Sequence, residues 1–230
     1  MKIKRLLLNK LLRMGLTDKY RQRAFRIPRR WSNRELRRFG HLFSGDVVNV
    51  SAWEDRDKEG GFYRNYFPAT ASYSTTNFGT SQDTLQHTDN EIYLDLSKPI
   101  PPELERRFDA VFNHTTLEHL FEFQTAFANL CAMSRDVVII VVPWLQPLHS
   151  DYGDFWRFSP QALPRMFSRE GLTTLHLSWN DDKGAAVYVF AIASRNPEAW
   201  REHFPDAIAD PWSPEMVSLP PNNAGRATFS

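Results

Sequence analysis

The densest group of chemically active side chains in the sequence lies between His149 and Arg157. His149 is followed two residues later by Asp151 and five residues later by Asp154. A carboxylate that orients an imidazole can make it a general base, and an unperturbed histidine titrates near neutral pH. His149, oriented by Asp151, is therefore the first candidate for a catalytic base. A simpler interpretation stays open for Asp154 and Arg157, which could form an ion pair that only holds a loop.

Histidine and aspartate also bind metal ions, so the same segment could belong to a metal site. Metal-binding histidines often occur at short, regular spacings, as in H-E-x-x-H. No further histidine or glutamate stands at such a spacing around His149, and Cys131 is the only cysteine of the chain. We therefore expect no bound metal and no disulfide framework.

A second polar segment, Asn113 to His119, contains two histidines and one carboxylate. It follows an apolar stretch that is typical of a strand, and reactive groups often stand where a strand ends. This makes His114 the second candidate for a catalytic residue. A purely structural alternative is that a threonine of this segment caps the next helix, with Glu118 in its first turn.

Three other expected strand ends carry groups that could contact a nucleotide-like ligand. Gly60 and Gly61 could let the backbone approach a ligand closely. Asn77 could bind a ribose through hydrogen bonds, although without a charge. Asp95 could accept a hydrogen bond from an adenine amino group, and Leu96 could offer its backbone N–H. Each of these positions also suits an ordinary turn.

The apolar pattern predicts an alternation of strands and helices. The expected strands are Val47–Trp53, Ala71–Phe78, Glu91–Leu96, Phe108–Thr115, Asp136–Leu145, Leu172–Asn180 and Ala185–Arg195. Helices are expected from about Leu117 to Ser134 and between Ser159 and Gly171. The nearly continuous apolar run of the fifth strand is typical of a strand buried on both faces. The pattern favours a Rossmann-like, doubly wound α/β sheet with helices on both faces and an antiparallel C-terminal hairpin.

Charge is distributed unevenly along the 230 residues. Residues 1–45 contain 14 Lys and Arg against 2 acidic residues, while the rest of the chain contains 14 against 25. The formal net charge of +1 therefore hides a basic arm on an acidic body. The arm either packs onto the body by charge or meets an external polyanion, and the sequence leaves both open.

Three parts of the chain differ in character. Residues 1–31 form a basic amphipathic arm, residues 32–200 the α/β domain, and residues 201–230 a tail expected to be loosely ordered. Ser32 and Glu35 match a capping box, which predicts that the first helix of the domain begins there. Residues 2–13 could cover the domain, act as a transit peptide or lie on a membrane surface.

The segments Phe108–His119 and Val141–Gly171 resemble class I S-adenosylmethionine-dependent methyltransferases of the type 11-like group, in an atypical bacterial branch. The resemblance extends more weakly over about residues 45–195. It implies a seven-stranded sheet with a reversed last strand and a pocket for S-adenosylmethionine at the ends of the first four strands. The family's glycine-rich first motif is degenerate, because Asn49–Trp53 replaces it, and Asn77 stands where the family has a ribose-binding carboxylate.

The resemblance also implies roles for individual residues. The methionine part of the cofactor is expected near Val50, Ser51, Gly60 and Gly61. The ribose is expected at Asn77, and the adenine at Asp95 and Leu96. Asn113 and His114 are expected near the sulfonium, with His149 and Asp151 on the substrate side.

Two functions from different classes follow. The first is methyl transfer from S-adenosylmethionine to a hydroxyl of a polar small molecule or glycan, with the protein in the cytoplasm. The alternative is a catalytically inactive methyltransferase-like binding or scaffold protein that docks to a membrane surface or a partner through its basic arm. We do not expect nucleic-acid binding, because the body is acidic and no nucleic-acid motif is present.

Overall fold

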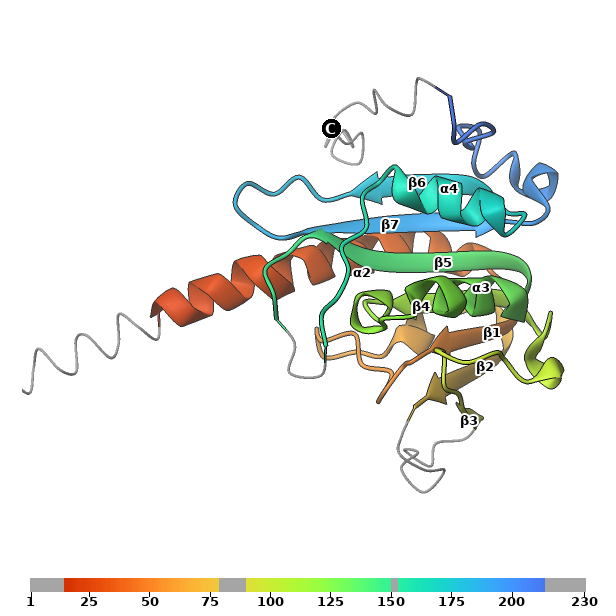
Figure 1. Ribbon diagram of the computed structural model, residues 1–230, viewed down its shortest axis with the longest axis horizontal. Helices are drawn as coiled ribbons and strands as arrows, with labels where there is room; N and C mark the ends of the chain where they lie inside the picture. The colour runs from red at the N-terminus through yellow and green to blue at the C-terminus, as the bar shows by residue number, and fades with distance from the viewer. Residues whose placement is uncertain (1–14, 79–89, 150–152, 214–230) are drawn as a thin grey trace, which may run out of the picture.

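Seven strands form one sheet in the computed structural model, which describes residues 15–78, 90–149 and 153–213 (Figure 1). The strands are β1 (Gly45–Val50), β2 (Thr70–Asn77), β3 (Glu91–Tyr93), β4 (Phe108–His114), β5 (Ser134–Leu145), β6 (Thr173–Trp179) and β7 (Val187–Ser194). Their order across the sheet is β3-β2-β1-β4-β5-β7-β6. β7 runs antiparallel to β5 and β6, and all other neighbours are parallel. The predicted mostly parallel sheet with an antiparallel C-terminal hairpin is confirmed.

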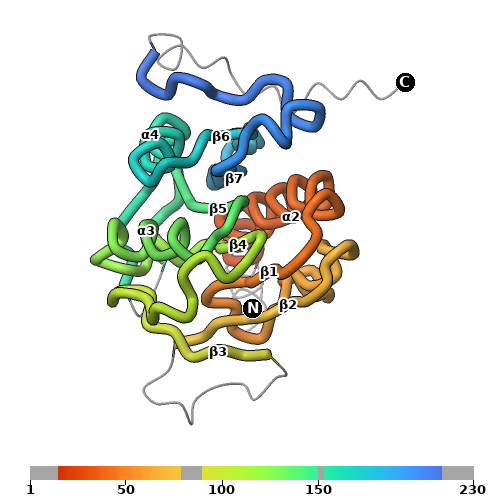
Figure 2. Tube along the Cα trace, turned by 90° about the vertical axis from the view of Figure 1, so that its right-hand side faces the viewer, coloured from red at the N-terminus to blue at the C-terminus, as the bar shows by residue number. Residues whose placement is uncertain are grey.

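Helices cover both faces of this sheet, as predicted. α3 (Phe123–Met133) and α4 (Ala162–Arg169) lie on one face, and α2 (Ile27–Phe39) lies on the other (Figure 2). The chain therefore has the three layers of a doubly wound fold.

The interior strand β5 separates two apolar cores. Val138 and Ile140 pack in the core that contains α3 and α4, whereas Ile139 and Val141 pack in the core that contains α2. All four side chains are fully buried. Because successive side chains of a strand point to opposite faces, the apolar run follows directly from burial on both sides.

The first helix begins earlier than predicted. Residues 15–21 are helical, and a π-helical segment, Gln22–Arg26, leads without interruption into α2. The expected helix start at Ser32 is wrong, because Ser32 lies inside α2 and its hydroxyl donates to the carbonyl of Arg29 at 2.9 Å. The helix thus crosses the boundary expected between residues 31 and 32.

Burial explains why the capping-box pattern misled. Ala24 and Trp31, both upstream of or next to the expected start, are already buried against the domain. Glu35 is buried too, and its carboxylate accepts hydrogen bonds from Arg38 and Ser178 and contacts His176. The pair Ser32 and Glu35 therefore serves tertiary packing and does not cap a helix.

The turn after β4 also differs from the prediction. A short 3-10 turn, Leu117–His119, precedes α3, so the expected helix from Leu117 to Ser134 is two separate elements. The helical conformation is interrupted here because Leu120 adopts an extended backbone conformation. The break leaves the carbonyl of Glu118 free to accept the backbone N–H groups of Phe155 at 2.7 Å and Trp156 at 3.3 Å.

The beginning of the C-terminal tail packs on the domain, contrary to the expectation of loose order from residue 201. Phe204 is buried in the α2-side core. The backbone N–H of Ile208 donates to Thr174 O at 2.8 Å, and Arg165 donates to Pro211 O at 3.2 Å. The aromatic anchor was overlooked because the tail as a whole, residues 201–230, is rich in Pro, Asn and Ser. Residues 214–230 lie outside the described residues.

Part of the basic arm packs onto the body, which was one of the two possibilities that charge left open. Arg30 pairs with Glu59 at 3.5 Å, and Arg37 donates to the hydroxyl of Tyr66 at 3.0 Å. Residues 2–13 lie outside the described residues. Within the described part of the chain, every helix is too short or too polar to cross a bilayer.

The end of α2 offers a stability test with a matched control. A Cβ added at Gly40 would lie 2.1 Å from the carbonyl oxygen of Tyr66, whereas a Cβ at Gly15 meets nothing within 4 Å. We expect Gly40→Ala to lower the free energy of unfolding by about 1–3 kcal/mol through overpacking. Gly15→Ala should raise it by up to about 1 kcal/mol, because alanine favours a helix. Urea unfolding of both variants checks this, and an unchanged midpoint for Gly40→Ala would contradict the packing.

Candidate active site

A cavity of about 870 Å³ lies at the carboxyl ends of the parallel strands. Its wall includes residues that follow β1, β2, β3 and β4, together with Arg29 from α2. In a doubly wound fold this is where ligands bind, and the volume lies in the range of small-molecule sites.

Five of the predicted site residues line this cavity. They are Ser51, Asn77, Asp95, Leu96 and His114. The sheet topology thus brings together positions that are far apart in the sequence.

Four of the predicted cofactor-binding residues do not line it. Val50 is buried in the core between β1 and α3, and Asn113 is buried where its amide donates to Val50 O at 2.9 Å, which ties β1 to β4. Gly61 lines a separate cavity of about 280 Å³ with Asp57 and Tyr66, and Gly60 has open space around it. The glycine pair does not reach the large cavity because Asp57 holds the N–H of Gly61 at 2.8 Å.

The loop after β1 is organised by a buried carboxylate. Asp55 accepts hydrogen bonds from the amide of Asn49 at 2.9 Å, the hydroxyl of Tyr73 at 2.7 Å and both the backbone and the side chain of Arg64 at 3.1 Å. The loop is therefore a folded structure around an acid that is 2% exposed. Its backbone takes left-handed conformations without glycine at Ser51, Trp53, Asp55 and Lys58.

Asn77 at the end of β2 pins this loop. Its Oδ1 accepts the backbone N–H of Trp53 at 2.5 Å, and its Nδ2 donates to Trp53 O at 3.0 Å and to the carboxylate of Glu91. The amide is thus used in both directions by protein groups. Trp53 lines the cavity with a side chain that is 60% exposed.

The loop after β3 presents a charged acceptor to the cavity. Asp95 accepts hydrogen bonds from the hydroxyl of Ser97 at 2.6 Å and lies 3.1 Å from Lys98 Nζ. Burial opposes its ionisation, but the bonds from Ser97 and Lys98 outweigh it and lower the pKa of Asp95. Asp95 is therefore a carboxylate at neutral pH.

Arg29 is a part of the wall that sequence reasoning missed. Its guanidinium donates to the hydroxyl of Tyr63 at 2.9 Å, to the hydroxyl of Thr115 at 3.1 Å and to Nδ1 of His114 at 3.1 Å. All three acceptors are neutral groups, and Arg29 has no salt bridge among the described residues. Its basic neighbours in the sequence concealed it, because the whole segment was interpreted as an arm.

These contacts fix the protonation of His114. Arginine only donates, so Nδ1 of His114 accepts and its proton resides on Nε2, which lies 2.9 Å from the hydroxyl of Ser32. Burial, and then the charge of Arg29, hold the pKa of His114 well below its usual range. Both nitrogens of this neutral ring are engaged, which makes it a poor proton acceptor.

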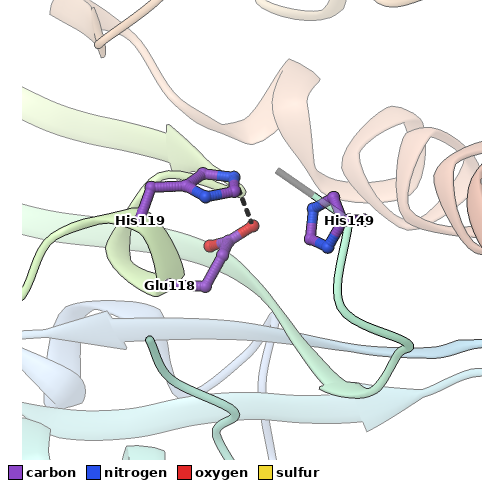
Figure 3. Close-up of side chains that lie close together, drawn as sticks. All are labelled: Glu118, His119 and His149. Atoms are coloured by element: carbon purple, nitrogen blue, oxygen red, sulfur yellow. Dashed lines mark ion pairs between the residues drawn. The ribbon is translucent and has the colours of Figure 1, made fainter. Parts of the chain in front are cut away.

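A second group of titratable side chains lies beside the cavity (Figure 3). Glu118 and His119 come from the turn after β4, and His149 comes from the loop after β5. One potential ligand atom of each lies within 4.8 Å of the others. The three side chains point toward one another, and His119 also lines the cavity. Burial raises the pKa of Glu118 to about 8.

Among the described residues, the carboxylate partner of His149 is Asp154. Its Nδ1 lies 3.1 Å from Asp154 Oδ2 and 3.2 Å from Pro147 O. Hydrogen bonds from Arg157 lower the pKa of Asp154 to about 2, so the expected ion pair exists and also orients the histidine. Asp151 lies outside the described residues. His149 itself does not line the cavity but packs edge-on against His119, with ring centroids 5.3 Å apart.

No family model and no curated protein sequence matches the chain. Its structure is similar to a Bacillus halodurans C-125 protein described as a methyltransferase, with 11% identity, 70% of this chain and 97% of that chain covered, and a TM-score of 0.52. It is also similar to an S-adenosylmethionine-dependent methyltransferase from Clostridium acetobutylicum ATCC 824, with 10% identity, 80% of this chain and 98% of that chain covered, and a TM-score of 0.52. A third similar structure is the 1,6-didemethyltoxoflavin-N1-methyltransferase of Burkholderia thailandensis, crystallised with 1,6-didemethyltoxoflavin and S-adenosylhomocysteine. Its identity is 15%, 81% of this chain and 88% of that chain are covered, and the TM-score is 0.50. At these identities the likeness establishes the fold: the chain has the fold of class I methyltransferases.

The importance of Asp55 can be measured against its neighbour Glu54. Asp55→Ala removes the acceptor of the buried Asn49 amide and of the Tyr73 hydroxyl, so we expect the free energy of unfolding to fall by about 3 kcal/mol. Glu54→Ala breaks only an exposed pair with Arg56 and should cost less than about 1 kcal/mol. Urea unfolding of the two variants tests this, and equal losses would show that Asp55 does not organise the loop.

Proposed function

We propose that the protein is an S-adenosylmethionine-dependent methyltransferase that acts on a hydroxyl of a polar small molecule or glycan. The observation that carries this proposal is the cavity of about 870 Å³ at the carboxyl ends of β1 to β4. It occupies the ligand position of a fold shared with methyltransferases, one of which was crystallised with S-adenosylhomocysteine.

The residues of the cavity suit this cofactor at the adenine end. The ionised Asp95 can accept a hydrogen bond from the adenine amino group, and Leu96 lies next to it in the cavity wall. Asn77 fits a ribose less well, because Trp53 already uses its amide in both directions. Trp53 is part of the wall of this cavity, whose volume is about 870 Å³.

The wall of the cavity carries three basic residues. Arg29, Arg56 and Lys58 belong to the wall, and Arg29 has no acidic partner among the described residues. A guanidinium held by neutral acceptors is well prepared to bind a carboxylate or phosphate. This supports an acceptor that carries an anionic group beside its hydroxyl. His114 then serves to position Arg29, because both of its ring nitrogens are engaged.

Bound S-adenosylmethionine supplies an electrophilic methyl group, so the protein must hold the acceptor oxygen in line and remove its proton. His149 is the proposed base, with Asp154 in place of Asp151 as the described carboxylate that orients it. His119 packs edge-on against His149 and lines the cavity, so it is the member of this pair that can contact the acceptor directly. The loss of a general base costs about 100-fold to 10,000-fold in rate.

Calorimetric titration with S-adenosylmethionine and S-adenosylhomocysteine tests the cofactor. We expect one-to-one binding that Asp95→Ala weakens by about tenfold or more, because a charge-assisted hydrogen bond is lost. Asp181→Ala, on an exposed turn, is the matched control and should bind like the wild type. No heat with either ligand would refute the enzyme and favour the inactive binding protein.

His149→Ala separates catalysis from cofactor binding. Polar hydroxyl compounds with an anionic group are first screened for formation of S-adenosylhomocysteine by the wild type. With an acceptor found in this way, His149→Ala should lose at least about 100-fold in turnover while its affinity for S-adenosylmethionine stays unchanged. An equal loss of both quantities would mean that His149 only supports the structure.

A further inference from the structure

We propose that Glu118, His119 and His149 form a binding site for a divalent transition-metal ion, with Zn²⁺ as the best match. Two imidazoles and one carboxylate are a common ligand set of zinc sites with an open position. The three potential ligand atoms already lie within 4.8 Å of one another (Figure 3). Bonds of about 2.0–2.2 Å to one ion would draw them together by roughly an ångström.

Both histidines are held in the form that a metal needs. Nδ1 of His119 lies 2.6 Å from the carbonyl oxygen of Gly153, and a carbonyl can only accept, so this nitrogen carries the proton. Nδ1 of His149 likewise faces only acceptors, Asp154 Oδ2 at 3.1 Å and Pro147 O at 3.2 Å. In each ring the lone pair is therefore on Nε2. Metal-binding histidines typically donate their other N–H to a carboxylate or carbonyl in this way.

Glu118 supplies an independent indication of a missing partner. Its side chain is completely buried, and neither carboxyl oxygen has a hydrogen-bond partner among the described residues. His119 Nε2 lies 3.6 Å from Glu118 Oε1, which is beyond hydrogen-bond distance. A buried oxygen without a partner is costly, and a cation bound between Glu118 and the two rings would satisfy it.

The surroundings suit a cation. Asp154 and Arg157 neutralise each other. The negative charge of the ligand set would come from Glu118, which gives up its proton when it binds the ion. Because His119 also lines the large cavity, the ion would lie at the cavity wall, where it could bind the acceptor oxygen and favour loss of its proton. With the ion bound, His149 is a ligand, and the ion takes over from it the task of favouring proton loss. This catalytic role rests on the proposed methyl transfer, whereas the binding of the ion does not.

The test uses the untagged full-length protein, treated with a chelator and then titrated with Co²⁺. We expect one equivalent to give the visible absorption bands of Co²⁺ bound through nitrogen, and Zn²⁺ to displace it. Glu118→Gln and His149→Ala should each weaken Co²⁺ binding by about 100-fold or more, and Asp154→Asn by about 10-fold to 100-fold. His203→Ala, an exposed histidine away from the cluster, should bind like the wild type.

Two results would overturn the site: no saturable Co²⁺ absorption by the wild type, or affinity that Glu118→Gln and His149→Ala leave unchanged. Circular dichroism checks that the variants fold. If His149→Ala does not fold, the nearly isosteric Glu118→Gln decides whether the metal site exists. Calorimetry with S-adenosylmethionine is run separately. Metal binding without cofactor binding would refute the methyltransferase and support the metal site. Cofactor binding without metal binding would support the methyltransferase and refute the metal site.

Discussion

The buried carboxylate of Asp55 does the work that glycines do in the first motif of related folds. The loop after β1 takes left-handed backbone conformations at four residues that are not glycine, each of which costs about 1–2 kcal/mol. Asp55 offsets this cost by accepting four hydrogen bonds from three residues. Asn77 adds two hydrogen bonds with the backbone of Trp53. These bonds hold the loop at the end of β2, where it forms part of the cavity wall. A degenerate glycine motif is therefore compatible with an open ligand site.

The basic arm has a structural role that its composition conceals. α2 packs its apolar face on the sheet and brings Arg29 to the cavity, where Tyr63, His114 and Thr115 fix the guanidinium. A positive charge held by neutral groups is stabilised further by any anion that enters. The uneven charge of the chain thus partly reflects a site built from the basic segment and the body together, rather than an external polyanion alone.

The sequence predicted those features of the fold and the site that depend on neighbouring residues, and it missed those that depend on contacts between distant segments. The strands and the hairpin were predictable, because burial on one or both faces leaves a period in the sequence. The placement of Asp95 and Leu96 followed from topology. Arg29 was missed because Ser32 and Glu35 imitate a helix start, and only tertiary packing shows that they do not. The cluster of Glu118 with His149 was missed because it joins two loops, and no spacing within either loop encodes that contact.

That contact couples the two sides of the cavity. The turn Leu117–His119 continues from β4, whose end forms the cavity wall, and the carbonyl of Glu118 anchors the loop after β5 through Phe155 and Trp156. The same turn receives Gly153 O at His119. A shift of the loop that carries His149 must therefore disturb the wall against which a cofactor would lie. The proposed cofactor and acceptor sites are therefore joined through this turn by a few hydrogen bonds, which the sheet alone does not provide.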